Sequence, residues 1–190
     1  TDGGSTVKDN ISYIGKSTGN SSTYVWSSGQ NSYGELGHGD VTQRRSFARV
    51  THLDDKHIEN LGAGNEHSVF VDRDGKLFVC GYNENGQCGL GTTQQARHVT
   101  PLPETFSLFD QKVSKAHVFN GCEHTLVTTI DGDLFAFGYN YRGQLGVGST
   151  NSELSPKLVQ GPLLRKQVIS CASSYHHSLM LCSDGSLFSV

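Results

Sequence analysis

The chain has 190 residues, a formal net charge of −3 and 23 glycines, with one tryptophan and one methionine. This slightly acidic balance argues against a general nucleic-acid-binding surface, which would be basic. Long apolar runs at helical spacing are scarce, whereas short runs of β-forming residues between glycine-containing turns are frequent, so the composition predicts an all-β protein.

The sequence contains no recognisable signal peptide and no apolar span of about 18 residues, so it gives no support for secretion or membrane insertion. Its five cysteines are an odd number without dense spacing. We interpret them as reduced thiols and expect a cytoplasmic or nuclear protein.

Residues 1–23 are rich in glycine, serine, threonine and asparagine, with one short apolar patch at positions 11–14. We predict a flexible N-terminal lead-in that carries one weak strand. Gly15-Lys16-Ser17 resembles the end of a phosphate-binding loop, but Asn10 replaces the upstream glycine that this motif requires. The sequence therefore predicts no phosphate site here.

A glycine-rich stretch at residues 26–39, WSSGQNSYGELGHG, returns at 80–91 and again at 137–148. The steps between copies are 52 residues (81 minus 29) and 57 residues (138 minus 81). Glycine adopts positive φ at little cost, so each copy predicts one tight loop. A period near 50 residues is typical of propellers and repeat arrays. The repeated structural positions are Gly29, Gly34 and Gly37, then Gly81, Gly86 and Gly89, then Gly138, Gly143 and Gly146.

A second repeated unit, at residues 67–81, 124–138 and 176–190, has the pattern of a β-hairpin. Two runs of β-forming residues flank an Asp-Gly turn, whose glycine supplies the left-handed position of a short loop. Leu77 and Val79 alternate with an equally apolar Phe78, so we expect both faces of this strand to be buried between neighbouring sheets.

The segments that join each glycine loop to the next hairpin are predicted to supply the other two strands of a four-stranded unit. The middle segment, 92–120, is the longest and carries Phe106 and Phe109 after two prolines. It is either a packed blade edge or an exposed loop that binds a partner. Arg44 and Arg45, the basic pair within the repeats, are either solvated or part of the same kind of contact. The candidate partner-binding residues are Phe106, Phe109, Arg44 and Arg45.

Taken together, Glu-His-Ser/Thr, Asp-Gly-x-Leu-Phe and Gly-x-Asn-x-x-Gly-Gln-Leu-Gly resemble the repeat of the regulator of chromosome condensation family over residues 24–190. The resemblance implies part of a seven-bladed β-propeller with four antiparallel strands per blade. Glu35 and Cys88 depart from the glycine motif, Ser174 replaces a glycine, and Gly15 stands where a histidine is expected. Three repeats cannot close a ring of seven, so we expect a slice of a larger domain whose open faces are covered by further repeats or a second copy.

The histidines that open the hairpins, His67, His124 and His177, are the tempting catalytic candidates. Catalytic residues are not needed once per blade, so we predict that each is structural and bonds the backbone of a neighbouring strand. A zinc site built from the cysteines and histidines would need a ligand spacing that is absent, so no metal, cofactor or catalytic residue is predicted. The residues considered for zinc are Cys122, His124, Cys171, His176, His177 and Cys182.

These observations favour a non-catalytic protein-interaction platform within a larger regulatory protein. The resemblance also suggests an alternative, a guanine-nucleotide exchange factor for a small GTPase of the Ran or Rho kind. A plant ultraviolet-B photoreceptor of the same fold would need a cluster of tryptophans, and Trp26 is the sole tryptophan of this chain. We expect another protein as the partner, with a small GTPase as one candidate.

Overall fold

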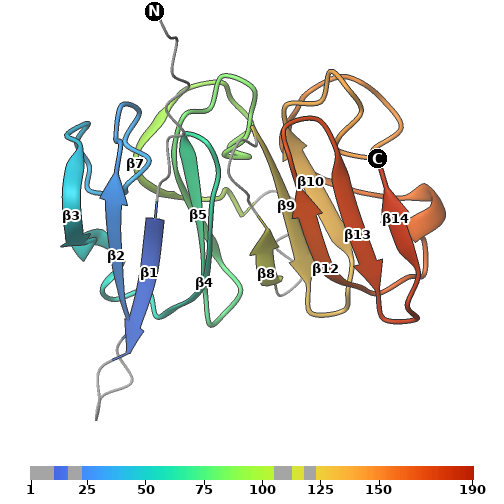
Figure 1. The fold of residues 1–190 in the computed structure, drawn as a ribbon, viewed down its shortest axis with the longest axis horizontal. Coiled ribbons are helices and arrows are strands. Elements are labelled where there is room, and N and C mark those ends of the chain that lie inside the picture. Colours follow the sequence, from blue (N-terminus) through green and yellow to red (C-terminus); the bar gives the residue numbers. More distant parts are fainter. Residues whose placement is uncertain (1–10, 17–22, 105–112, 118–122) are drawn as a thin grey trace, which may run out of the picture.

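The computed structural model of the protein describes residues 11–16, 23–104, 113–117 and 123–190. Within these residues, four antiparallel sheets stand side by side in chain order, from blue to red in Figure 1. The helical elements described are single turns such as η1 (Thr51–Leu53) and η3 (Gly161–Leu163). The predicted all-β fold is confirmed.

Each sheet is one blade. Among the described residues, blades 2 and 3 have four strands, and blades 1 and 4 have three. Blade 1 contains β1 (Ile11–Lys16), β2 (Thr23–Gly29) and β3 (Arg44–Arg49). Blade 2 contains β4 (Ile58–Ala63), β5 (His67–Asp72), β6 (Leu77–Gly81) and β7 (Ala96–Pro101). Blade 3 contains β8 (Val113–His117), β9 (His124–Thr129), β10 (Leu134–Gly138) and β11 (Glu153–Leu158). Blade 4 contains β12 (Val168–Ser173), β13 (Ser178–Cys182) and β14 (Leu187–Ser189).

The boundaries of the sequence repeat do not coincide with the boundaries of the blades. The two strands predicted between a glycine loop and the next hairpin do not join one sheet: β3 closes blade 1, whereas β4 opens blade 2. The reason is the pairing itself, because β6 pairs with β7 across the glycine loop and β5 pairs with β4. Strand β1 lies within the predicted lead-in and pairs along its length with β2.

The hairpin turns have the predicted chemistry. Gly75, Gly132 and Gly185 have φ values of 83°, 90° and 83°. In the first turn, the Asp72 carboxylate accepts the N–H groups of Asp74 at 2.9 Å and Lys76 at 2.8 Å. Local side-chain bonding of this kind fixes a short turn without help from the rest of the chain.

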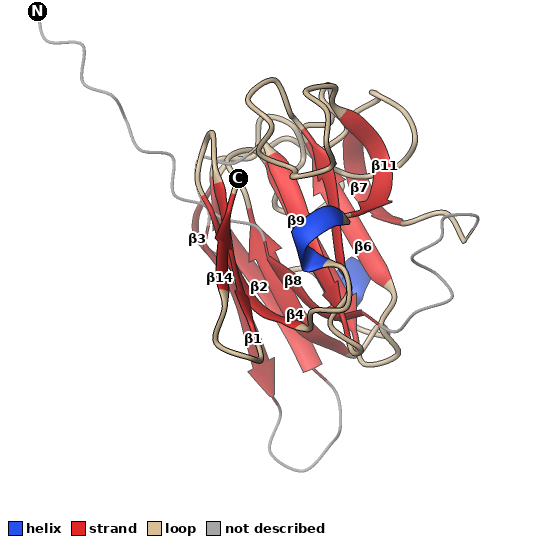
Figure 2. Ribbon diagram, turned by 90° about the vertical axis from the view of Figure 1, so that its right-hand side faces the viewer, coloured by secondary structure: helices blue, strands red, loops and turns tan. Residues whose placement is uncertain are grey.

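The core lies between neighbouring blades, and the turned view of Figure 2 looks along the row of sheets, which overlap in it. Phe78 of blade 2 belongs to the cluster against blade 1, and Phe137 of blade 3 to the cluster against blade 2. Met180 of blade 4 packs against blade 3 in the same way. In β6 and β10, successive residues alternate between two such clusters, so both strand faces are buried, as predicted.

The third copy of the hairpin differs from the prediction. Leu187 of β14 is 66% exposed, whereas the equivalent Leu77 and Leu134 are each 2% exposed. Blades 2 and 3 are each covered on this face by the next blade, and within the described residues no sheet covers blade 4. The expected histidine position in blade 1 also differs: β1 pairs Gly15 with Tyr24 and Ile11 with Ser28. The position opposite Gly29 is therefore not Gly15, and it lies outside the described residues.

Candidate functional site

A buried asparagine closes each glycine loop. Asn140 donates from Nδ2 to the carbonyls of Ser149 at 2.9 Å and Asn151 at 2.8 Å, and its Oδ1 accepts the Leu145 N–H at 3.0 Å. Asn31 and Asn83 make the corresponding bonds in the first and second loops. One side chain thus replaces three backbone bonds that an irregular loop would otherwise leave unmade. The repeated Gly-x-Asn spacing is the sequence signal for this role, which the prediction had not assigned.

The hairpin histidines connect neighbouring blades. His67 Nε2 of blade 2 lies 3.0 Å from Thr125 Oγ1 of blade 3, and that hydroxyl donates to the Gln87 carbonyl at 2.7 Å. His124 Nε2 lies 2.9 Å from Ser178 Oγ of blade 4, whose hydroxyl donates to the Gln144 carbonyl at 2.8 Å. The bond therefore goes to a hydroxyl and reaches the backbone through it, rather than directly as predicted.

The direction of these bonds fixes the chemistry. Each hydroxyl proton is already donated to a carbonyl, so the histidine must donate its Nε2 proton to the hydroxyl oxygen. Burial, with a smaller contribution from His124, lowers the pKa of His67 to about 3. Burial, with a smaller contribution from His177, lowers the pKa of His124 to about 4. Both rings are neutral donors near pH 7, and neither is placed to take a proton from the neighbouring hydroxyl. His177 is exposed.

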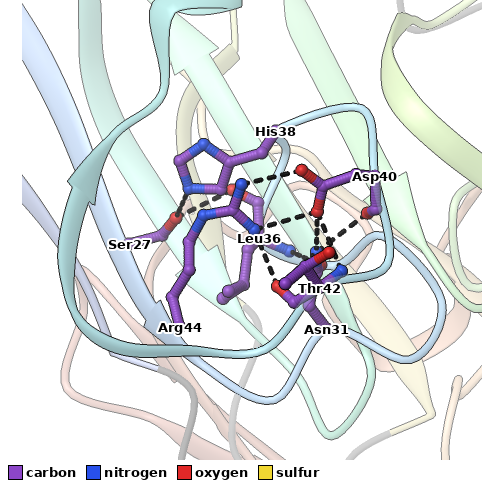
Figure 3. Close-up of polar contacts among 7 residues, drawn as sticks. All are labelled: Ser27, Asn31, Leu36, His38, Asp40, Thr42 and Arg44. Carbon is purple, nitrogen blue, oxygen red and sulfur yellow. Dashed lines mark hydrogen bonds and ion pairs between the residues drawn. The ribbon is translucent and has the colours of Figure 1, made fainter.

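The first glycine loop departs from this pattern in a polar cluster drawn in Figure 3. Ser27 Oγ donates to the Leu36 carbonyl at 2.8 Å and lies 3.0 Å from His38 Nε2. The equivalent positions in the other blades are apolar, with Val79 and Leu90 in blade 2. Burial lowers the pKa of His38, and the nearby Arg44 lowers it further. Ser27 is buried, and its hydroxyl already donates a hydrogen bond to the Leu36 carbonyl. The Ser27–His38 pair is therefore a structural contact and not a nucleophile with its base.

Arg44 belongs to the same cluster. Its guanidinium donates to both Asp40 carboxylate oxygens, at 2.9 and 2.8 Å, in the two-pronged geometry seen in Figure 3. Hydrogen bonds from Arg44 and from the Thr42 N–H hold the pKa of Asp40 well below its usual range. Arg44 therefore stabilises the first glycine loop through its ion pair with Asp40, whereas Arg45 is exposed on β3. Phe106 and Phe109 lie outside the described residues, so their role stays a prediction.

An aromatic and acidic surface forms where the glycine loops meet Glu123, which directly precedes β9, and the β12–β13 turn. The rings of Tyr33 and Tyr82 lie 4.8 Å apart across the first two loops. The Tyr175 hydroxyl donates to Glu123 at 3.1 Å, and burial followed by the charge of Glu123 raises the pKa of Tyr175. Tyr141, in the third loop, is 66% exposed. We call the surface formed by Tyr33, Tyr82, Glu123, Tyr141 and Tyr175 the tyrosine face. The sequence prediction did not include these residues.

A hollow of about 530 Å³ opens at the other end of blade 2. Leu77 and Phe78 of the hairpin line it, together with Pro101 and Pro103 from the described start of the long middle segment. Within the described part of the chain, no group of three histidine, cysteine or acidic side chains could hold a metal ion. No described helix is long and apolar enough to cross a membrane.

Comparison with known proteins gives consistent results. The sequence profile of the regulator of chromosome condensation (RCC1) repeat matches residues 24–71, 74–128 and 131–181. The secretion-regulating guanine nucleotide exchange factor of Bos taurus is 32% identical over 167 residues, 87% of this chain and 34% of that protein. The ultraviolet-B receptor UVR8 of Arabidopsis thaliana is 30% identical over 165 residues, 86% of this chain and 36% of the receptor.

The probable E3 ubiquitin-protein ligase HERC4 of Rattus norvegicus is 32% identical over 173 residues, 89% of this chain and 15% of the ligase. The chain thus spans between 15% and 36% of the length of these three relatives. Among solved structures, human WBSCR16 matches with a TM-score of 0.72 at 22% identity, over 94% of this chain and 47% of that one. Prp20p of Saccharomyces cerevisiae, described with its binding to Gsp1p and histones, matches with a TM-score of 0.73 at 18% identity, over 89% and 41%. At such identities, the likeness shows a shared fold.

Proposed function

Because the chain belongs to the regulator of chromosome condensation (RCC1) repeat family, we propose that it is a non-catalytic platform that binds another protein. The proposal rests on one observation: the described histidine and serine side chains that could act in catalysis are instead engaged in structural hydrogen bonds. His67 and His124 are neutral, buried and hydrogen-bonded to hydroxyls of the next blade. The Ser27 hydroxyl donates a hydrogen bond to a backbone carbonyl. The histidines hold neighbouring blades together and Ser27 holds the first glycine loop, whereas His124 Nδ1, which has no hydrogen-bond partner among the described residues, is buried out of reach of a substrate.

The tyrosine face supplies what binding requires. Tyrosine offers a large rigid contact area and a polar hydroxyl, which is why it is frequent in protein interfaces. Tyr141 is 66% exposed on the third glycine loop, which the bonds of Asn140 hold, and Tyr175 is 43% exposed on the β12–β13 turn, where its carbonyl accepts a hydrogen bond from Gln144. We propose this face as one contact surface, and the middle segment with Phe106 and Phe109 as a second.

The alternative is guanine-nucleotide exchange on a small GTPase. Two relatives favour it: one is named as an exchange factor, and Prp20p is described as binding Gsp1p. Both are longer than this chain, and their names say nothing about which residues act. We therefore keep exchange as the second candidate function.

Release of fluorescent GDP from a panel of small GTPases separates the two proposals. The platform proposal expects the spontaneous release rate at substoichiometric protein, whether or not a GTPase binds. Catalysed release would overturn it in favour of exchange.

Binding of the same GTPases tests the face. For any GTPase that binds, Tyr141→Ala should weaken the affinity by about tenfold or more. Ile130→Ala, which changes an equally exposed residue (63%) on the β9–β10 turn at the other end of blade 3, should leave binding unchanged.

A further inference from the structure

Neutral side chains from two neighbouring blades hold the carboxylate of Glu123. Its Oε2 accepts a hydrogen bond from Asn85 Nδ2 of the second glycine loop at 3.2 Å, and its Oε1 accepts one from the Tyr175 hydroxyl of the β12–β13 turn at 3.1 Å. A carboxylate oxygen can accept two hydrogen bonds, so each oxygen keeps one acceptor position after these contacts. Glu123 is half-buried. Its carboxylate is therefore fixed in place while part of its bonding capacity is open to a ligand.

No described side chain neutralises this charge through an ion pair. The ion pairs within the described residues involve other acids, and neither Glu123 nor Glu84 takes part in one. Glu84 lies on the second glycine loop, where its Oε2 accepts a hydrogen bond from the Tyr82 hydroxyl at 2.9 Å. Arg142 is the one basic residue of the second and third glycine loops, and it forms no ion pair with either acid. The surface therefore favours a cationic ligand.

Tyrosine rings lie beside these carboxylates. Burial, then the hydrogen bond and charge of Glu84, and then the charge of Glu123, raise the pKa of Tyr82 to about 12. Burial and then the charge of Glu123 raise the pKa of Tyr175. Both hydroxyls are protonated at neutral pH, so both rings are uncharged. A cation bound at Glu123 thus lies close to aromatic rings, whose faces attract cations.

The exposure of Tyr141, at the edge of this surface, is a property of its place in the loop. Ser32 and Glu84 occupy the same place in the first and second glycine loops, and both are also exposed. A following blade packs on those two loops, because a methyl group added at Gly34 or Gly86 would lie 2.6 or 2.7 Å from its backbone. A neighbouring blade therefore leaves this position open.

We propose that the tyrosine face binds an arginine side chain of a partner protein, with the guanidinium hydrogen-bonded to Glu123 and stacked on a tyrosine ring. This inference rests on the proposed platform function, because it names the chemistry of the partner at the same face. A guanidinium offers paired donors that match the two open acceptor positions of the carboxylate, and it also stacks on aromatic rings. A lysine ammonium is a compact point charge, and the phosphates of a nucleic acid would be repelled here.

A titration with N-acetyl-arginine methylamide at constant ionic strength, followed by NMR of the backbone amides, tests the proposal. The amides of Tyr82, Asn85, Glu123 and Tyr175 should shift and saturate with a Kd of about 1–10 mM, a weak affinity because one side chain supplies the whole contact. The lysine compound should bind severalfold more weakly. The citrulline compound, which has the shape of arginine without its charge, should cause no saturable shift.

Glu123→Gln removes the charge and keeps an oxygen that can accept the Tyr175 hydroxyl. This variant should weaken arginine binding by about tenfold or more. Glu59→Gln is the matched control and should bind arginine as the wild type does, because Glu59 is exposed at the start of β4, at the other end of blade 2. If Glu123→Gln has lost its cooperative melting, Glu84→Gln replaces it and should weaken binding by about threefold.

The proposal would be overturned if no saturable shift occurred up to about 50 mM arginine compound. Equal binding of the lysine or citrulline compound, or unchanged binding by the glutamine variant, would overturn it as well. The titration contains no GTPase, so its outcome is separate from that of the platform function. If arginine fails to bind while Tyr141→Ala still weakens a GTPase, the partner chemistry is wrong and the platform stands. Catalysed GDP release overturns the platform whatever the titration shows.

Discussion

Glu35 occupies a position that the other loops give to glutamine. Its Oε2 accepts the Tyr33 N–H at 2.8 Å, as the side-chain oxygen of Gln144 accepts the Arg142 N–H at 3.0 Å. Gln144 also donates from Nε2 to the Tyr175 carbonyl at 3.2 Å, whereas Glu35 Oε1 is buried without a hydrogen-bond partner. Burial raises the pKa of Glu35, and the nearby Glu66 adds to this. The folded chain therefore favours the protonated acid, which could donate as Gln144 does, whereas Nε2 of Gln87 in the second loop is buried without a partner among the described residues.

Glu35→Gln should stabilise the protein at neutral pH. A carboxyl whose pKa is raised on folding contributes stability that is complete below its unfolded pKa and is lost as pH rises through the folded pKa. At pH 7 to 8, the variant should gain about 1–2 kcal/mol, the usual cost of a buried polar atom without a partner. Near pH 4, the two chains should be similar. Urea unfolding at both pH values measures the difference, and an equal gain at pH 4 would exclude ionisation as its cause.

The inter-blade hydrogen bond of His124 leads to the opposite dependence of stability on pH. The folded pKa of His124 is lowered to about 4, so the stability that it contributes is present above its unfolded value, about 6.5, and is lost as pH falls to the folded pKa. His124→Ala should cost about 1–3 kcal/mol at pH 7, because Ser178 loses its donor. The exposed His177→Ala is the control and should cost little. Thermal unfolding from pH 7 to pH 4 should show a shallower loss for His124→Ala than for the wild type.

At the scale of elements, the sequence predicts what is local and misses what is not. The Asp-Gly hairpins and glycine loops are predictable because side chains within a few residues determine them, as Asp72 and Asn140 do. The division of linker strands between two blades is a long-range pairing choice that local pattern does not contain. The Ser27–His38 contact was missed because it replaces apolar residues in one blade only. The tyrosine face was missed because its members come from separate loops and turns.

Two glycines in the same conformation separate backbone strain from inter-blade packing. Gly86 and Gly143 both have φ of 82°, so alanine at either position costs about 1–2 kcal/mol in the left-handed region. Only at Gly86 would the new methyl lie 2.7 Å from the backbone of the next blade. Gly86→Ala should therefore destabilise by about 2 kcal/mol more than Gly143→Ala, from overpacking against β11. Denaturant midpoints at matched slopes give the comparison, and equal losses would show that the close approach has no energetic effect.

At the scale of the whole molecule, the chain is a row of blades in which each contacts only its neighbours. Blades 2 and 3 are covered on both faces, and within the described residues blades 1 and 4 are covered on one. In such an array, stability is close to a sum of the blades and of the interfaces between them. The interface between blades 2 and 3 contains Phe135 and Phe137, which are each almost completely buried.

Hydrogen exchange should therefore be slowest in the centre and faster toward both ends. Amides of β5, β6, β9 and β10 should exchange only through the largest opening, whereas those of β13 and β14 should exchange through loss of blade 4 alone. Phe135→Leu removes packing at the central interface and should speed exchange in blades 2 and 3 together. Leu187→Ala, at the exposed face of blade 4, should leave exchange in both blades unchanged. Mass spectrometry of peptides from each blade measures the gradient. Uniform protection across the four blades would mean that the chain unfolds as one cooperative unit, and the additive description would then be wrong.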